Sequence, residues 1–335
     1  MLKALERTVG FAEGVVMSFD PDVLLPNAFA ATNGRSLADA LVACRNEQLD
    51  EDFLKFRDLA AGRSRVRVAG RETDPRTRSS PRWLEILDAR GHGHELRAAL
   101  VDGSGQCWGA FNFQREASRP FTDGDIRQVE SRLQRNAAAI ARSMVATRVP
   151  AGDGLEAGAV WLDTGGGVVF ASPAAQRWLD LLDAQSYAGF SRALLAGLAM
   201  RVAAGHERGR ADGPAAGDVG AGQAYAVRAR SADGRWVRAR AEKITLPDGN
   251  APGVAVVIDA ARAGDVLPLA ASAYQLTGRE LEVVRCVLNG LDTRSVAASL
   301  HISEYTVQDH LKSVFTKAGV RSRRELAHQF AVQFG

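Results

Sequence analysis

The stretch Ser303–Gly319 (SEYTVQDHLKSVFTKAG) narrows the fold of this chain more than any other. Serine is a favoured N-cap and glycine is favoured just after a last helical turn, so the stretch predicts one helix of about four turns. Apolar residues recur along one face of that helix at spacings of three and four: Val307, Leu311, Val314, Phe315 and Ala318. The other face carries groups that suit base edges and phosphates in a DNA major groove: Gln308, Asp309, Lys312 and Lys317.

The flanking residues predict three further helices. Residues 277–280 (TGRE) form a capping box that would begin a helix ending at residues 289–290 (NG). Asp292 would cap a short helix, and a three-residue turn then leads to the helix that begins at Ser303. This is helix-turn-helix spacing. Residues 322–325 (SRRE) form a second capping box, which would start a last helix.

With these motifs, residues 276–326 resemble the LuxR-type (GerE-like) helix-turn-helix domain. The matches to the family pattern are Leu276, Thr277, Arg279, Glu280, Glu282, Val283, Gly290, Ala297, Leu300, Ile302, Ser303, Thr306, Val307, His310, Leu311, Lys317, Gly319, Val320, Arg323 and Glu325. The resemblance implies an all-α four-helix domain over residues 271–335 that binds double-stranded DNA. The implied DNA-binding residues are Thr277, Arg279, Ser303, Glu304, Thr306, Val307, Gln308, Asp309, His310, Lys312, Lys317, Arg321 and Arg323.

The expected recognition helix departs from the family pattern at one informative place. Where lysine most often follows Thr-Val, this chain has Gln308 and then Asp309. Glutamine can pair with adenine and aspartate can accept from cytosine, whereas lysine favours guanine or phosphate, so we expect a different site preference. The alternative for Asp309 is a solvent-facing position repelled by phosphate, and His310 can be a packed residue or a phosphate donor. Thr306 lies in the first helical turn, where phosphate binding is favoured.

Positive charge is local to this region, because the whole chain has a net charge of only +3. Five basic residues and no acid occur between positions 312 and 324: Lys312, Lys317, Arg321, Arg323 and Arg324. A few phosphate contacts give weak, salt-sensitive binding by one copy. We therefore expect a homodimer on an inverted-repeat operator.

Residues 96–145 predict a hairpin followed by a long helix. Strands are expected at 96–101 and 107–113 around an Asp-Gly turn, and residues 121–125 would cap a helix that runs to about residue 146. With the helical residues before 60 and a basic loop at 63–82, this order resembles a GAF sensor domain, here residues 1–147. GAF domains bind ligands between sheet and covering helices, which makes pocket candidates of Trp83, His92, Cys107, Trp108 and Phe111. Such aromatic residues are more often core, and His92 alone does not indicate a metal site.

The long helix also carries an apolar stripe at spacings of three and four, which could join two subunits. The candidate dimerisation residues on it are Ile126, Val129, Leu133, Ile140 and Met144. The cysteines Cys44, Cys107 and Cys286 are odd in number and widely spaced, so neither a disulfide framework nor a zinc site is expected.

A Gly/Ala/Pro-rich linker is expected at 148–158, and the order of elements after it resembles a PAS domain over residues 159–260. A strand pair at 159–171 precedes two helices, and three strands follow between 224 and 259. No histidine or cysteine is placed as a haem or flavin handle, so no cofactor is expected. Residues 261–270 would be a second linker.

The predicted fold class is therefore α+β multidomain: GAF-like and PAS-like antiparallel-sheet sensor domains, then the LuxR-type domain, as in actinobacterial regulators that this arrangement resembles. We expect a cytoplasmic, non-enzymatic transcription regulator controlled by a small molecule or protein contact, with RNA polymerase as a candidate partner. No apolar run long enough to span a membrane occurs, and neither a phosphoacceptor pattern nor a P-loop is visible. The alternatives are a signalling enzyme, for which no catalytic set is visible, and a scaffold whose helix-turn-helix binds protein.

Overall fold

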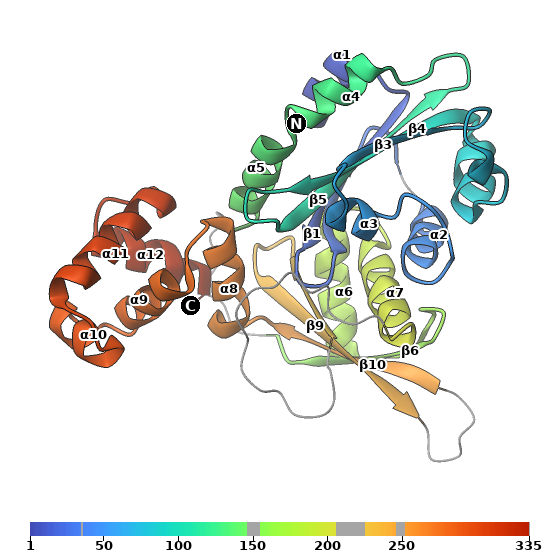
Figure 1. The fold of residues 1–335 in the computed structure, drawn as a ribbon. Coiled ribbons are helices and arrows are strands. Elements are labelled where there is room, and N and C mark those ends of the chain that lie inside the picture. The colour runs from blue at the N-terminus through green and yellow to red at the C-terminus, as the bar shows by residue number, and fades with distance from the viewer. Residues whose placement is uncertain (35, 146–154, 206–224, 246–251, 335) are drawn as a thin grey trace.

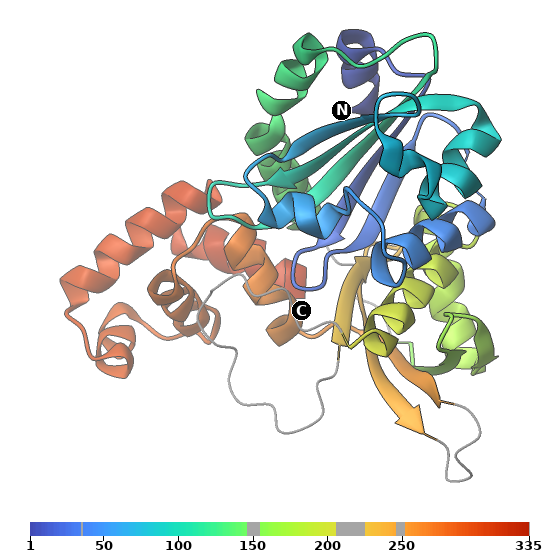
Figure 2. The same ribbon diagram turned by 45° about the vertical axis from the view of Figure 1, so that its right-hand side comes forward.

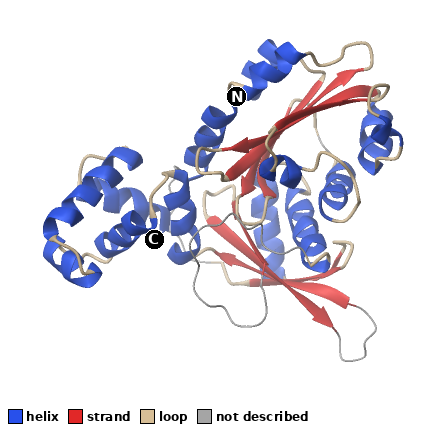
Figure 3. Cartoon of the chain, viewed as in Figure 1, coloured by secondary structure: helices blue, strands red, loops and turns tan. Residues whose placement is uncertain are grey.

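The computed structural model describes residues 1–34, 36–145, 155–205, 225–245 and 252–334. It consists of two regions that each contain an antiparallel sheet, followed by a helical C-terminal domain (Figures 1 and 3). Residues 148–154 of the predicted first linker lie outside the described residues.

The first region packs helices on both faces of a five-stranded sheet with the order β2-β1-β5-β4-β3. Because β4 is buried along its whole length, its sequence does not alternate between apolar and polar residues as a half-exposed strand would. Helices α1, α4 and α5 cover one face, and α2 and α3 lie on the other (Figure 1). Its elements are α1 (Leu2–Val9), β1 (Glu13–Asp20), β2 (Leu25–Ala31), α2 (Leu37–Gln48), α3 (Phe56–Ala61), β3 (Val66–Gly70), η1 (Pro75–Arg78), η2 (Trp83–Leu87), η3 (Asp88–Arg90), β4 (His92–Val101), β5 (Cys107–Glu116), α4 (Asp123–Glu130) and α5 (Leu133–Val145).

The second region has a sheet with the order β7-β6-β10-β9-β8, which is the same order by position as in the first. Both regions therefore run strand pair, helices, three strands, although the sequence predicted this order only for the second. The elements are β6 (Gly158–Asp163), β7 (Val168–Ala171), α6 (Pro173–Gln185), α7 (Phe190–Ala203), β8 (Tyr225–Arg230), β9 (Trp236–Thr245) and β10 (Pro252–Ala260).

Helix α7 packs against its own sheet and also against α2 and β2 of the first region, so it lies between the two sheets (Figure 2). A buried arginine joins the regions as well. Arg228 on β8 donates to Asp20 Oδ1 at 2.6 Å and Oδ2 at 2.8 Å, and to the carbonyl oxygen of Asp265 at 2.9 Å. The first region, the second region and the segment that leads to the C-terminal domain thus meet at one guanidinium group.

The C-terminal domain is helical: α8 (Ala263–Ala273), α9 (Gly278–Leu288), α10 (Thr293–Leu300), α11 (Glu304–Ala318) and α12 (Arg323–Phe334). Residues 261–270 were expected to be a linker, but most of them belong to α8. Its side chains Val266, Leu269 and Ala270 are buried, and the helix packs on α5 and α12. The connection between the two sheet-containing regions and the C-terminal domain is therefore a packed helix, because its apolar residues enter a shared core.

The helix expected from residue 121 to about 146 is two helices, α4 and α5. At the joint the amide of Arg132 donates to the carbonyl of Val129 at 3.0 Å, a tighter i−3 bond that changes the helix direction. The apolar stripe faces inward: Val129, Leu133 and Met144 are buried in the core of this chain, and Ile126 and Ile140 pack against it. The stripe is thus used for packing within the chain, and its role in joining two subunits stays a prediction.

Candidate nucleic-acid interface

Helix α11 is held at both ends by local sequence. Ser303 Oγ accepts a hydrogen bond from the amide of Thr306 at 3.0 Å, and Gly319 ends the helix at a φ of 71°. The preceding turn is tight because His301 adopts a left-handed conformation with φ 54°. These features confirm the predicted helix bounds and fix the angle between α10 and α11.

Its inner face locks α11 into the domain. Val307 and Val314 are fully buried and Leu311 is nearly so, in a core shared with α9, α10 and α12. Val307 was a DNA-binding candidate, but its side chain lies in this core. Its role is to position the helix, because a buried side chain cannot reach a base edge.

The outer face of α11 presents the groups that the sequence singled out. Gln308, Asp309 and Lys312 are all exposed, and Lys312 Nζ lies 3.7 Å from Asp309 Oδ1. The Lys312 side chain keeps 76% of its surface exposed, so this contact is loose and solvated. Glu304 is also exposed, whereas Thr306 and His310 are half-buried.

Tyr305 is an exposed residue that the sequence analysis missed. It lies in the first turn of α11 and is 71% exposed. Its signal was present in the sequence, because an aromatic residue outside the three-and-four spacing of the apolar face must point away from the core.

Lys317 is also exposed, but its ammonium group forms an ion pair within the domain. Its Nζ donates to both carboxylate oxygens of Glu280 on α9, at 2.7 and 2.9 Å, and Ser313 Oγ donates to the same carboxylate at 2.6 Å. The amide of Thr277 donates to it as well, at 2.6 Å. Burial alone would raise the pKa of Glu280, but the bonds from Lys317, Ser313 and Thr277 lower it to about 2. This cluster clamps α11 to α9.

Arg279 also makes internal contacts. Its guanidinium donates to the carbonyl oxygen of Leu300, the last residue of α10, and pairs with Glu282 at 2.5 Å. Thr277 caps α9, because its Oγ1 accepts from the amide of Glu280 at 3.2 Å. These side chains hold the bundle together.

The basic residues after α11 surround the start of α12. Ser322 Oγ accepts from the amide of Glu325 at 3.1 Å, as the second capping box predicted, whereas Glu325 Oε2 accepts at 2.8 Å from the amide of Arg321, one residue before the cap. Arg321 and Arg324 are exposed and Arg323 is half-buried.

The five pocket candidates of the first region do not gather around one cavity. All three aromatic candidates are fully buried: Trp108 and Phe111 lie in one core cluster and Trp83 lies in another. Trp108 Nε1 donates to Asp102 Oδ2 at 2.8 Å. Burial raises the pKa of the Cys107 thiol to about 11. His92 begins strand β4, and its Nε2 lies 3.6 Å from Glu13 Oε1. None of the five is among the described residues that line the cavity between this sheet, α2 and α7.

Two further features bear on the kind of site. Within the described ranges, no three His, Cys, Asp or Glu side chains gather as a metal ion would require. Over the same ranges, no helix combines the length and hydropathy needed to cross a bilayer.

Comparison with known proteins identifies the helical domain. Residues 274–330 match the family described as bacterial regulatory proteins, luxR family. The C-terminal domain is a LuxR-type helix-turn-helix domain. Similar curated proteins include the uncharacterized transcriptional regulatory protein YhcZ of Bacillus subtilis, 41% identical over 61 residues, and the nitrate/nitrite response regulator NarP of Escherichia coli, 40% identical over 60 residues. Each match covers 18% of this chain and 28% of the relative, so the chain spans under a third of their length.

Among solved structures, the Vibrio cholerae VqmA dimer, described in a work on LuxR-type receptors, is 17% identical. The matched region covers 52% of this chain and 81% of the VqmA chain, with a TM-score of 0.23. A score this low supports no structural conclusion. The relation to known proteins therefore rests on the LuxR-type domain.

Proposed function

We propose that the protein is a cytoplasmic transcription regulator that reads double-stranded DNA with helix α11. The proposal rests on the difference between the buried face and the exposed face of that helix. Val307, Leu311 and Val314 fix it in the core, while Gln308, Asp309 and Lys312 point outward with no buried partner among the described residues. Side chains of these types on a rigid helix suit base and phosphate contacts in a major groove.

Two of these residues would contact base edges directly. Gln308 would form hydrogen bonds with adenine, and Asp309 would accept a hydrogen bond from cytosine N4. Lys312 and the exposed Arg321 would contact phosphates. Lys317 and Arg279 would act indirectly, by holding the helices of the domain together. Lys317 pairs with Glu280, and Arg279 binds the carbonyl oxygen of Leu300 and the carboxylate of Glu282.

Binding as a homodimer to an inverted repeat completes the proposal, because one copy offers few phosphate contacts. The buried α4 and α5 stripe does not offer a free surface for the second copy. Exposed apolar side chains occur instead on the edge strand β7, at Val168, Val169 and Phe170. The first two regions serve as GAF-like and PAS-like sensors, and their link to the DNA-binding domain through α8 supports control by a small molecule or a protein contact.

A scaffold that uses α11 to bind protein is a second candidate, favoured by the exposure of Tyr305. Selection of bound sequences from a random DNA pool by the full-length protein, at two salt concentrations, separates the two. The regulator predicts an enriched inverted repeat with half-sites about one helical turn, or a multiple of it, apart. No binding, or binding without any sequence preference at either salt concentration, would refute sequence-specific regulation by the protein alone.

A further inference from the structure

A cavity of about 130 Å³ lies between the sheet of the first region, helix α2 and helix α7 of the second region. Its apolar wall includes Met17, Phe19, Phe29, Phe190 and Leu194. A cavity of about 150 Å³ in another protein accepts benzene, so this space suits a small molecule with an apolar body of similar size.

The polar part of the wall is unusual, because five of its side chains are more than nine-tenths buried and have atoms without a hydrogen-bond partner among the described residues. One of them is Arg82, whose Nη2 is unpaired although its other nitrogens are bonded. Arg97 has two such donors, Nε and Nη1, and Arg201 has one, Nε. Gln48 Oε1 and Gln114 Oε1 are acceptors in the same situation. Buried polar atoms are normally paired, so several on one small cavity indicate a ligand that pairs them.

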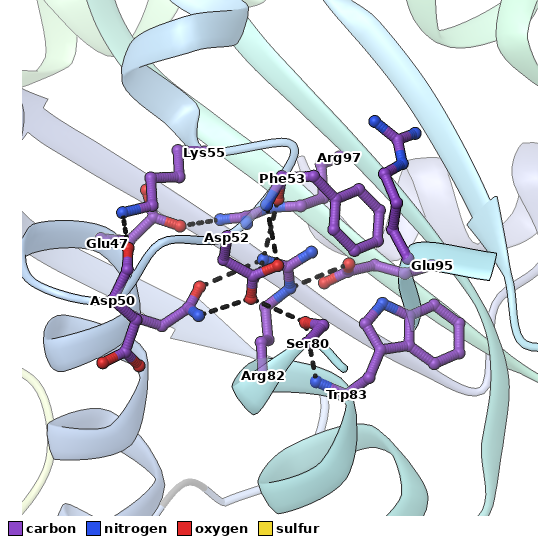
Figure 4. A network of polar contacts seen from close by, with 12 residues as sticks. Glu47, Asp50, Asp52, Phe53, Lys55, Ser80, Arg82, Trp83, Glu95 and Arg97 are labelled. Carbon is purple, nitrogen blue, oxygen red and sulfur yellow. Dashed lines mark hydrogen bonds and ion pairs between the residues drawn. The ribbon is translucent and has the colours of Figure 1, made fainter. Parts of the chain in front are cut away.

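The environment of Arg201 indicates that the ligand carries a negative charge. It is 4% exposed, and the structure gives it no ion pair with any described carboxylate. The neighbouring arginines differ: Arg82 is held by Asp52 at 3.4 Å and Glu95 at 3.1 Å, and Arg97 pairs with Glu47 (Figure 4). Because an isolated buried charge is costly, Arg201 calls for an anion inside the cavity.

We propose that the cavity binds a small monocarboxylate whose carboxylate pairs with Arg201 and whose apolar body lies against the aromatic and aliphatic wall. A carboxylate fits because a guanidinium presents two parallel donors to its two oxygens. The free Arg97 donors and the two glutamine oxygens then serve polar substituents on the body of the ligand.

The position of Arg201 gives the site a regulatory consequence, which rests on the proposed function. Arg201 belongs to α7 of the second region, whereas Arg97, Gln114 and Gln48 belong to the first. A carboxylate bound to Arg201 therefore favours the arrangement in which the two regions are docked. The same two regions meet the start of α8 at Arg228, so ligand binding would bias the placement of the DNA-binding domain.

Calorimetry on the full-length protein tests the site with isovalerate, hexanoate and benzoate, each compared with its neutral amide. The variant is Arg201→Gln, and the matched control is Arg192→Gln, an exposed arginine on the same helix. The control and the unmodified protein should bind at least one acid ten or more times more tightly than its amide. In Arg201→Gln that preference should fall below twofold.

Failure of all three acids to bind the unmodified protein, or equal affinity for acid and amide, would overturn the proposal. So would a preference that survives in a folded Arg201→Gln protein. If that variant does not fold, Arg201→Lys takes its place. Lysine keeps the positive charge but lacks the two parallel donors of a guanidinium, so this variant should bind the acid more weakly and should still bind it more tightly than the amide. The measurement contains no DNA, so a protein that fails to bind DNA can still show the acid preference.

Discussion

The clamp between Glu280 and Lys317 gives the sharpest prediction for the DNA-binding domain. Glu280→Gln keeps the shape of the side chain but removes the charge that Lys317 and the Thr277 amide use. The carboxylate is nearly fully buried, with 5% of its side chain exposed, so the lost interactions are not replaced by water. We expect α11 to loosen from α9 without a change of fold.

The magnitude follows from the pKa of Glu280, which is lowered from 4.5 to about 2. That difference corresponds to at most about 3 kcal/mol of stability. Since the amide oxygen of the substituted side chain can still accept from Ser313, a loss of about 2 kcal/mol is expected. The sign is set by a folded-state pKa below the unfolded one: the stabilisation is complete above pH 4.5 and disappears as the pH falls from 4.5 toward 2.

Hydrogen exchange of the full-length protein, read by mass spectrometry over α9 and α11, measures this loss locally. At neutral pH, Glu280→Gln should accelerate exchange in α11 about 30-fold, which is the factor that 2 kcal/mol represents. Glu282→Gln is the control, because Glu282 is half-exposed and pairs with Arg279 at the surface, so a change of about twofold is expected. Equal effects of the two substitutions would refute the clamp.

Three further predictions concern other parts of the chain. Lys312→Ala should weaken binding to a selected operator and reduce the salt slope by about 1, whereas Lys243→Ala, an exposed lysine on β9, should change neither in a fluorescence titration. Asp20→Asn breaks a buried ion pair with Arg228 and should lower the free energy of unfolding, measured in urea, by about 3–5 kcal/mol. The Asp22 side chain is 65% exposed, so Asp22→Asn should lower it by under about 1 kcal/mol, and similar losses from the two substitutions would contradict the interdomain role of Asp20. Cys107, with its pKa raised to about 11 by burial, should resist iodoacetamide at pH 8 in the native protein and react in urea, and rapid native labelling seen by mass spectrometry would contradict its burial.

The helical domain could be predicted closely because its signals are local. The side chains of Thr277, Asp292 and Ser303 each cap a helix within three residues in sequence, and each cap is present in the structure. Gly319 ends α11 in the left-handed conformation that the glycine predicted. Capping depends on neighbouring residues alone, so one sequence suffices to find it.

Features that depend on distant partners could not be predicted in the same way. Residues 63–82 looked like a basic loop, but Val66–Gly70 is strand β3, whose backbone pairs with β4 some thirty residues later. Lys317 looked like a phosphate donor because Glu280, its partner, is 37 residues away in the chain.

The cavity between the two regions could not be predicted for a related reason. The sequence pointed to aromatic residues such as Trp108, which the sheet and its helices bury completely. The cavity is instead lined by Arg97 from one region and Arg201 from another, and their convergence requires the packing of α2 on α7. Charged residues in ordinary helix and strand patterns carry no local signal that they will be buried.

A comparison of the DNA sequences bound by two proteins tests whether α11 reads base sequence. Sequences bound by the full-length protein and by Gln308→Lys are selected from the same random DNA pool at the same salt concentration. We expect an inverted repeat in both, with unchanged half-site spacing and a shift in base preference, from adenine toward guanine, at one symmetric position in each half-site. Identical motifs from the two proteins would contradict direct readout by Gln308 and leave the outer face of α11 without its proposed role.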